Sequence, residues 1–246
     1  MSFAGKVALV TGAGKNIGRA IALDLAANGA CLVVNGRADR AAVDGVVAEI
    51  NAAGGQAIGC LADVSDPVAV QAMVNAAVAA FGGIDILVSN AGLRRQTPFL
   101  EMSLTEWREI LSVALDGAFI LSRAAVPHML GRGGGAIVAL SGISTHVGTP
   151  NRCHVSASKA GLEGLMRALA IELAPFGITC NTVAPGAVET VRGASAGSRP
   201  QVPPNIPLGR PAAIEEIAAA VRFLAGPDGR YITGQTLHVN GGAFLT

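Results

Sequence analysis

Short apolar runs alternate with segments of helical periodicity along the whole chain, and this alternation restricts the fold more than any other feature. Strands are predicted at residues 7–10, 31–34, 57–61, 84–88, 136–140, 178–183 and 236–239. Helices are predicted at residues 17–28, 40–53, 67–81, 105–129, 155–176 and 214–224. Because such alternation produces parallel strands with right-handed crossovers, it predicts an α/β, doubly wound fold. We expect a seven-stranded parallel sheet with helices on both faces.

The length and composition favour one domain. Of the 246 residues, 51% are hydrophobic and 14% are charged, a balance that suits a large core around a covered parallel sheet. No linker or internal repeat divides the chain, so residues 1–246 are expected to form a single domain. Residues 191–211 are rich in Arg, Gly, Ser and Pro and show no periodicity, which is typical of a mobile lid over a substrate.

The charge pattern bears on partners and location. The net charge is +1 and the charges are scattered, so no nucleic-acid partner or anionic membrane surface is expected. No apolar stretch approaches the roughly 18–20 uncharged residues of a membrane span, and no signal-peptide core follows the first residues. The four cysteines are far apart in the sequence and form no Cys-x-x-Cys pair, which favours free thiols in a reducing compartment. We therefore expect a cytoplasmic protein that acts on a small molecule.

A glycine-rich segment follows the first predicted strand and opens the first predicted helix. It reads Thr11-Gly12-Ala13-Gly14-Lys15-Asn16-Ile17-Gly18. Glycines at such a turn let the backbone approach a pyrophosphate, and the helix N-terminus supplies free N–H groups and the positive end of the helix dipole. The position of the segment between a strand and a helix predicts a dinucleotide site in a Rossmann fold.

The end of the second predicted strand bears on the choice of dinucleotide. A carboxylate there would bind a ribose 2′-hydroxyl and repel a 2′-phosphate. The strand ends Asn35-Gly36-Arg37, and no carboxylate precedes Asp39. Arg37 can pair with a phosphate through two N–H groups, and Lys15 adds a second positive charge. The sequence favours NADP(H) over NAD(H), with solvated surface charges as the alternative reading of these two side chains.

Further motifs make the chain resemble the short-chain dehydrogenase/reductase family over its whole length. The glycine segment is similar to the family motif Thr-Gly-x-x-x-Gly-x-Gly, with Asn16 at the middle glycine, and asparagine tolerates a positive φ better than most residues. The other matching segments are Asp63-Val64, Ser89-Asn90-Ala91-Gly92 and Pro185-Gly186-Ala187-Val188-Glu189-Thr190. Residues 231–242 are similar to the tail of the 3-oxoacyl-acyl-carrier-protein reductases and their relatives.

This resemblance implies a nicotinamide cofactor and a homotetramer. Asp63-Val64 would contact the adenine, and the segment from Pro185 to Thr190 would border the nicotinamide. Together with the two cations named above, the predicted cofactor-binding residues are Gly12, Gly14, Lys15, Asn16, Ile17, Gly18, Arg37, Asp63, Val64, Asn90, Ala91, Gly92, Lys159, Pro185, Gly186, Val188 and Thr190.

The resemblance also implies a catalytic set of Tyr, Lys, Ser and Asn, of which only the Lys is present. In the family the Tyr exchanges the substrate proton, and the Lys four residues later lowers the Tyr pKa and binds the ribose. The Ser holds the substrate oxygen, and the Asn relays protons through water. Lys159 is retained, but Val155 stands at the Tyr position, Gly142 at the Ser position and Ala114 at the Asn position.

Two histidines are candidates for the missing acid. Hydride transfer to a carbonyl develops negative charge on oxygen, which needs an acid or strong hydrogen-bond donors. His154 adjoins the Tyr position, and histidine is a frequent general acid. It would point away from the face that Val155 and Lys159 share, unless the helix starts after it. His146 lies just past the fifth predicted strand, where the family has its substrate pocket.

Serines and the lysine are the other candidates. Ser144 or Ser141 could orient a substrate oxygen. Lys159 could itself act as the acid, directly or through water, if desolvation lowered its pKa.

These residues lead to three hypotheses about function. The first is an NADP(H)-dependent oxidoreductase with an atypical proton donor, acting on a carbonyl or alcohol such as a 3-oxoacyl thioester, or on an imine. The second is a non-catalytic NADP(H)-binding protein. The third is a non-redox enzyme on the same scaffold.

Overall fold

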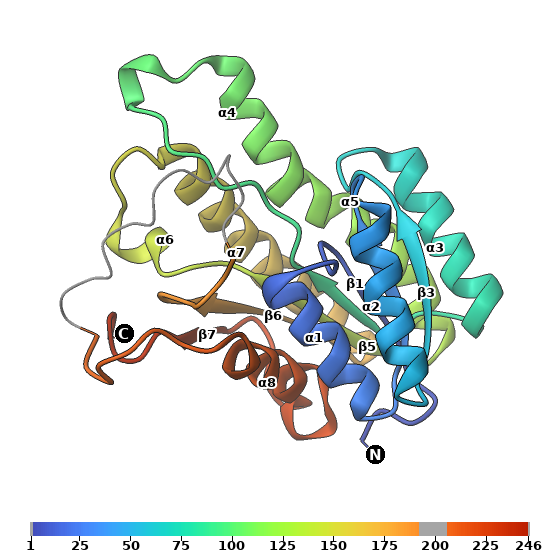
Figure 1. Ribbon diagram of the computed structural model, residues 1–246. Helices are drawn as coiled ribbons and strands as arrows, with labels where there is room; N and C mark the ends of the chain where they lie inside the picture. The colour runs from blue at the N-terminus through green and yellow to red at the C-terminus, as the bar shows by residue number, and fades with distance from the viewer. Residues whose placement is uncertain (1, 192–205, 246) are drawn as a thin grey trace.

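The computed structural model describes residues 2–191 and 206–245 (Figure 1). All seven strands lie in one parallel sheet with the order β3-β2-β1-β4-β5-β6-β7. The strands are β1 (Val7–Val10), β2 (Cys31–Gly36), β3 (Gln56–Leu61), β4 (Ile86–Ser89), β5 (Gly135–Leu140), β6 (Ile178–Pro185) and β7 (Thr236–Val239). The helices are α1 (Asn16–Ala27), α2 (Arg40–Ala52), α3 (Pro67–Phe81), α4 (Leu104–Leu111), α5 (Gly117–Gly131), α6 (Ser144–Val147), α7 (Cys153–Leu173) and α8 (Ile214–Ala225). The predicted doubly wound Rossmann fold is confirmed.

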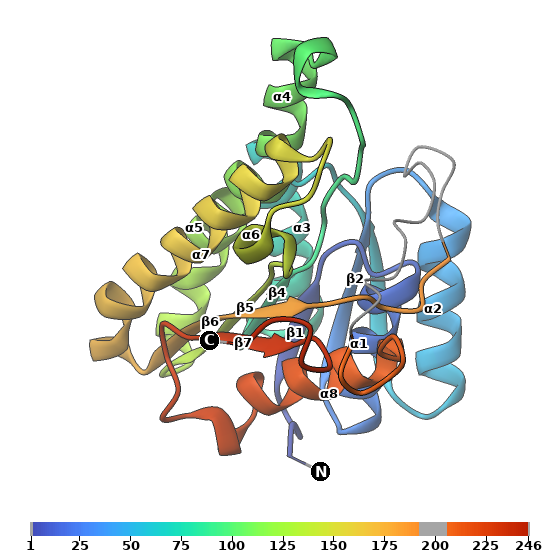
Figure 2. The same cartoon turned by 90° about the vertical axis from the view of Figure 1, so that its left-hand side faces the viewer.

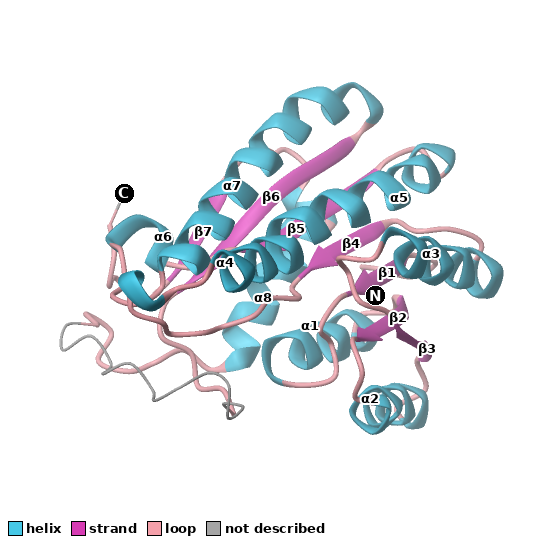
Figure 3. Ribbon diagram, turned by 90° about the horizontal axis from the view of Figure 1, so that it is seen from above, coloured by secondary structure: helices cyan, strands magenta, loops and turns pink. Residues whose placement is uncertain are grey.

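Two helical layers cover the sheet. Seen from above, α1, α2 and α8 lie on one face, and α3, α5 and α7 lie on the other (Figure 3). Because successive side chains of a strand point to opposite faces, β1 contributes Ala8 and Val10 to the core beneath the first layer and Leu9 to the core beneath the second. All three residues are fully buried. Apolar strands of this kind need cover on both faces, which explains the low charge content.

Several element boundaries differ from the predicted ones. The predicted helix 105–129 is divided, because a π-helical turn, Ser112–Asp116, separates α4 from α5. The fourth strand begins at Ile86 rather than at residue 84, and α7 begins at Cys153, before His154 rather than after it. The short helix α6 was not predicted. The π-turn lets α4 project beyond the sheet (Figure 2).

The helical stretch Leu104–Gly131 is the one candidate membrane span among the described residues, by length and composition alone. Within the fold, its α4 part contacts α7, and its α5 part contacts α3 and β4. A core helix of a globular protein passes the same test.

The predicted lid covers residues 191–211, most of which lie outside the described residues. Val191 is described at one side of the gap, and Ile206 and the residues after it at the other. The lid therefore stays a prediction.

Candidate functional site

The glycine-rich loop between β1 and α1 is a close-packed turn. Gly12 has φ 60° and Asn16 has φ 51°, so both lie in the left-handed region. Asn90, which follows β4, donates from Nδ2 to the carbonyl oxygens of Thr11 at 2.8 Å and Gly12 at 3.2 Å. A Cβ on Gly18 would lie 2.6 Å from Asn90 Nδ2 and would collide with the Gly12 carbonyl. Glycine is therefore required at position 18 for this approach.

The start of α1 fits a pyrophosphate. The N-cap residue Lys15 makes no side-chain capping bond, and the first turn contains no acidic residue. Asn16 does not cap the helix either, because its amide exchanges two hydrogen bonds with the backbone of Val191, at 2.9 and 2.8 Å. The N–H groups of the first turn are thus left for an anion, as at other helix N-termini that bind phosphates.

The polar side chains at the end of β2 differ in what they contact. Asn35 is buried, donates to the Ala62 carbonyl at 3.1 Å and accepts from the Gly12 N–H at 3.4 Å, so it fastens the glycine loop to the sheet. The Asp39 carboxylate caps α2 by accepting from Ala42 N at 3.0 Å. Arg37 is exposed. Sequence reasoning missed the role of Asn35, although a polar residue inside an apolar strand was a visible signal.

The predicted adenine contact, Asp63, is held in a local turn. Its Oδ1 accepts from the N–H of Ser65 at 2.9 Å and from the hydroxyl of Ser65 at 2.7 Å. These bonds lower the pKa of the Asp63 carboxyl, and the positive charge of Arg37 contributes in the same direction. Asp63 and Arg37 are therefore close enough for their charges to interact.

Lys159 lies where α7 meets the end of β5. Its Nζ donates to the Leu140 carbonyl at 2.5 Å, and a Cβ on Gly92 would lie 3.6 Å from the same Nζ. Loss of hydration, followed by the positive charge of Arg94, lowers the pKa of Lys159 to about 8. An ammonium has three donors, so two remain after the bond to Leu140.

The Pro185–Thr190 segment lies beside the same strand ends. The Pro185 carbonyl accepts from Ile143 N at 3.0 Å, and Gly186 N donates to the Val239 carbonyl at 3.0 Å. Val188 pairs with Ala212 in an isolated bridge. A Cβ on Gly186 would lie 2.9 Å from Asn240, which explains glycine at this position.

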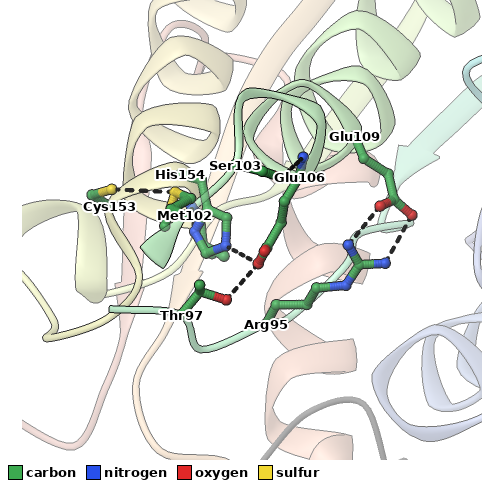
Figure 4. A network of polar contacts seen from close by, with 9 residues as sticks. Arg95, Thr97, Met102, Ser103, Glu106, Glu109, Cys153 and His154 are labelled. Atoms are coloured by element: carbon green, nitrogen blue, oxygen red, sulfur yellow. Dashed lines mark hydrogen bonds and ion pairs between the residues drawn. The ribbon is translucent and has the colours of Figure 1, made fainter. Parts of the chain in front are cut away.

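His154 is buried in a polar network at the start of α7 (Figure 4). Its Nδ1 accepts from Val155 N at 3.0 Å, and its Nε2 lies 3.2 Å from Glu106 of α4. Thr97 donates to the same carboxylate at 2.6 Å. Since Nδ1 is an acceptor, the ring proton belongs on Nε2 and points at Glu106. Both ring nitrogens are engaged, and the side chain is 0% exposed.

A second cluster joins Ser141, His146 and Glu163. The Glu163 carboxylate is buried, accepts from Ser141 Oγ at 2.5 Å and lies 3.1 Å from His146 Nε2. The His146 ring stacks on Phe244 with centroids 5.1 Å apart and meets His238 edge-on at 4.6 Å. Sequence reasoning named Ser141 and His146 but missed Glu163, because nothing local signals that a glutamate one turn beyond Lys159 is buried.

Comparisons with known proteins agree with this geometry. A family profile described as enoyl-(acyl carrier protein) reductase matches residues 12–243. The chain is 39% identical to the 3-oxoacyl-[acyl-carrier-protein] reductase of Salmonella typhimurium over 100% of both chains, and 41% identical to that of Staphylococcus aureus over 98% of both. A dehydrogenase/reductase from Sinorhizobium meliloti 1021 superposes with a TM-score of 0.92 at 36% identity, covering 99% of this chain and 97% of that one.

The chain belongs to the short-chain dehydrogenase/reductase family. A mutant short-chain dehydrogenase/reductase of Serratia marcescens has a TM-score of 0.91 at 34% identity, covering 98% of this chain and 99% of that one. Membership makes the protein an NAD(P)-dependent oxidoreductase by class.

In this short-chain dehydrogenase/reductase, the positions where the resemblance implies the Tyr, Asn and Ser are apolar or lack a side chain. Val155 lies in the first turn of α7 with 8% of its surface exposed, and Ala114 lies in the π-turn with 3% exposed. A Cβ on Gly142 would make ordinary contacts, 3.8 Å from Ser144 Oγ and 4.0 Å from the Pro185 carbonyl. The space beside Gly142 is therefore open to a small group.

Proposed function

We propose that the protein is an NADP(H)-dependent oxidoreductase that acts on a carbonyl or alcohol, or on an imine, and that Lys159 supplies the proton. The observation that carries the proposal is the position of Lys159 at the end of β5 with a pKa of about 8. An acid with a pKa close to the operating pH is well suited to proton transfer. The 3-oxoacyl-[acyl-carrier-protein] reductases at 39–41% identity support 3-oxoacyl thioesters as a substrate class.

The cofactor preference rests on the charges near the end of β2. The nearest carboxylate of this loop, Asp39, is committed to capping α2. Arg37 and Lys15 are exposed and form neither hydrogen bonds nor ion pairs with residues that the structure describes. A 2′-phosphate would meet two available cations here, which supports NADP(H).

The bound dinucleotide would supply the hydride. Lys159 would hold its ribose with one free donor and deliver a proton to the substrate oxygen or nitrogen with the other. Ser144, whose Oγ lies beside Gly142, would give a hydrogen bond to that atom in place of the missing serine.

The other proton donors named from the sequence are less well placed. His154 has both nitrogens engaged and does not share the face of Lys159. His146 and Ser141 turn toward Glu163, so their polar atoms are directed into that cluster. We propose that these three residues support the site without exchanging the substrate proton.

The test follows NADPH absorbance across 3-oxoacyl thioesters, ketones, aldehydes and imines, with Lys159→Ala, His154→Phe and His146→Phe beside the unsubstituted protein. We expect turnover that Lys159→Ala abolishes and the histidine variants retain, and that declines as pH rises through about 8. Saturable NADPH binding without any turnover would instead indicate a nucleotide-binding protein without redox activity. A non-redox enzyme would show neither NADPH binding nor NADPH oxidation.

A cytoplasmic location stays a prediction from the cysteine spacing and the N-terminal sequence, and a homotetramer stays a prediction from the family resemblance. Gel filtration with light scattering tests the second.

A further inference from the structure

The glycine-rich loop carries Asn16 where the family motif has its middle glycine, although the backbone conformation there suits glycine better. Asn16 has φ 51°, a value that glycine adopts more freely than asparagine. What glycine cannot supply is a side-chain amide, with its acceptor oxygen and two N–H donors. The contacts of this amide therefore bear on why asparagine stands at this position.

The Asn16 amide pairs with the backbone of Val191, 175 positions away in the sequence. Its Nδ2 donates to the Val191 carbonyl at 2.9 Å, and its Oδ1 accepts from Val191 N at 2.8 Å. Two hydrogen bonds from one planar amide restrict both the distance and the direction of the chain at Val191. Asn16 thus joins the start of α1 to the chain that leaves β6 (Figure 2).

The chain between the end of β6 and Val191 is also held at its middle, by backbone groups and by packing. Glu189 N donates to the Ala212 carbonyl and Ala212 N donates to the Ala187 carbonyl, both at 2.9 Å. Val188 packs against the core beneath the first helical layer. The Asn16 side chain adds a tie at the far end of this segment, next to the glycine loop.

We propose that Asn16 is a positioning residue for the dinucleotide, and that it acts by holding Val191 beside the start of α1. The free N–H groups of that helix start would meet the pyrophosphate, and the family resemblance implies that the Pro185–Thr190 segment borders the nicotinamide. A segment that is already in place binds a ligand without the entropy cost of being ordered. The inference rests on the proposed NADP(H) binding, but the contact with Val191 can be tested without a cofactor.

Amide hydrogen exchange of the free protein tests the contact itself. In Asn16→Gly the Val191 N–H loses its acceptor, so we expect it to exchange about fivefold faster, the factor that corresponds to one net hydrogen bond. Asn151→Gly is the matched control, because Asn151 is the other non-glycine residue with a positive φ, 61°, among those that the structure describes. The control should leave the exchange of Val191 unchanged. Equal exchange of Val191 in Asn16→Gly and the unsubstituted protein would overturn the proposal.

The dissociation constant of NADPH, measured by nicotinamide fluorescence, tests the effect on the cofactor. Asn16→Gly should raise it about fivefold, and Asn151→Gly should leave it unchanged. Val191→Pro removes the N–H that donates to Asn16 and leaves the glycine loop unaltered, so it should raise the constant as well. Because both substitutions break one contact, the double variant should bind NADPH no more weakly than Asn16→Gly alone.

The other outcomes separate this role of Asn16 from the proposed cofactor. Additive effects in the double variant would show that Asn16 acts on NADPH directly, and would overturn its role through Val191. An unchanged dissociation constant in Asn16→Gly would overturn that role too, and would leave the proposed cofactor standing. An unsubstituted protein that binds no NADPH would refute the proposed cofactor and the role of Asn16 together.

Discussion

The two ends of the active-site edge of this sheet differ in how far they keep the family pattern. At the ends of β1 and β2, Asn90 and Asn35 bond the backbone of the glycine loop, and α1 opens without a cap. At the ends of β5 and β6, Val155 and Gly142 stand where the family resemblance implies a tyrosine and a serine, and Lys159 stands where it implies the lysine. Cofactor binding depends on the backbone conformation of the glycine loop, and several side chains hold that conformation through hydrogen bonds. Proton transfer depends on single side chains, so it can change while the fold stays the same.

The largest expected effect comes from rebuilding the catalytic end. Val155→Tyr with Gly142→Ser should raise the turnover of an uncharged ketone by about 100-fold, because a positioned acid typically contributes that much. The open space beside Gly142 admits the serine. NADPH oxidation is the measurement, with Gly142→Ser alone as the control. A double variant that folds and binds NADPH but gains nothing would show that the two ends differ by more than these residues.

At the cofactor end, Arg37→Asp should move the ratio of NADPH to NADH affinity by about 30-fold toward NADH, since one charge-assisted hydrogen bond is worth about 2 kcal/mol. Dissociation constants from nicotinamide fluorescence would measure it. Arg40→Asp, three residues on at the start of α2, is the control and should leave the ratio nearly unchanged. An unchanged ratio in Arg37→Asp would contradict the assignment of Arg37 to the 2′-phosphate.

Lys159 should lower the free energy of unfolding at neutral pH, because its ammonium loses hydration in the folded protein. Because its folded pKa of about 8 lies below the ordinary 10.5, the unfolded chain binds more protons between these values. The free energy of unfolding therefore suffers no penalty from this group above pH 10.5, and the penalty grows as the pH falls to 8. At pH 7, the free energy of unfolding of Lys159→Met, measured by urea denaturation, should be about 1–2 kcal/mol higher than that of the unsubstituted protein, after allowance for the partial exposure of the lysine. The difference in free energy of unfolding should vanish by pH 10.5. A difference that does not depend on pH would show that the lowered pKa of Lys159 is not its cause.

The smallest expected effect concerns Asn16, whose positive φ strains most side chains. Asn16→Ala should destabilise the protein by about 1 kcal/mol more than Asn16→Gly, because only glycine adopts this conformation freely. Both variants lose the two bonds to Val191, so their difference isolates the strain. Urea denaturation at constant pH measures it, and equal values would argue against a strained backbone.

Much of the fold could be predicted from local pattern. Strand and helix periodicity, Asp66 as the cap of α3 and the glycine loop all depend on residues close in sequence, and the structure agrees with each. The division at Ser112–Asp116 could not be predicted, since the apolar pattern runs on through the π-turn. The start of α7 at Cys153 was missed for a related reason, because no side chain caps that helix.

The sequence by itself determined the Rossmann fold and the glycine-rich loop, and it predicted a valine at the position of the family's tyrosine, because each is a matter of residue type at a fixed spacing. Only the tertiary structure decided which polar groups meet. It turned His154 to Glu106 across 48 positions, Ser141 to Glu163 across 22, and Lys159 to the end of β5 across 19. Contacts at such separations depend on how helices pack on the sheet, and packing is set by the whole core rather than by any one segment.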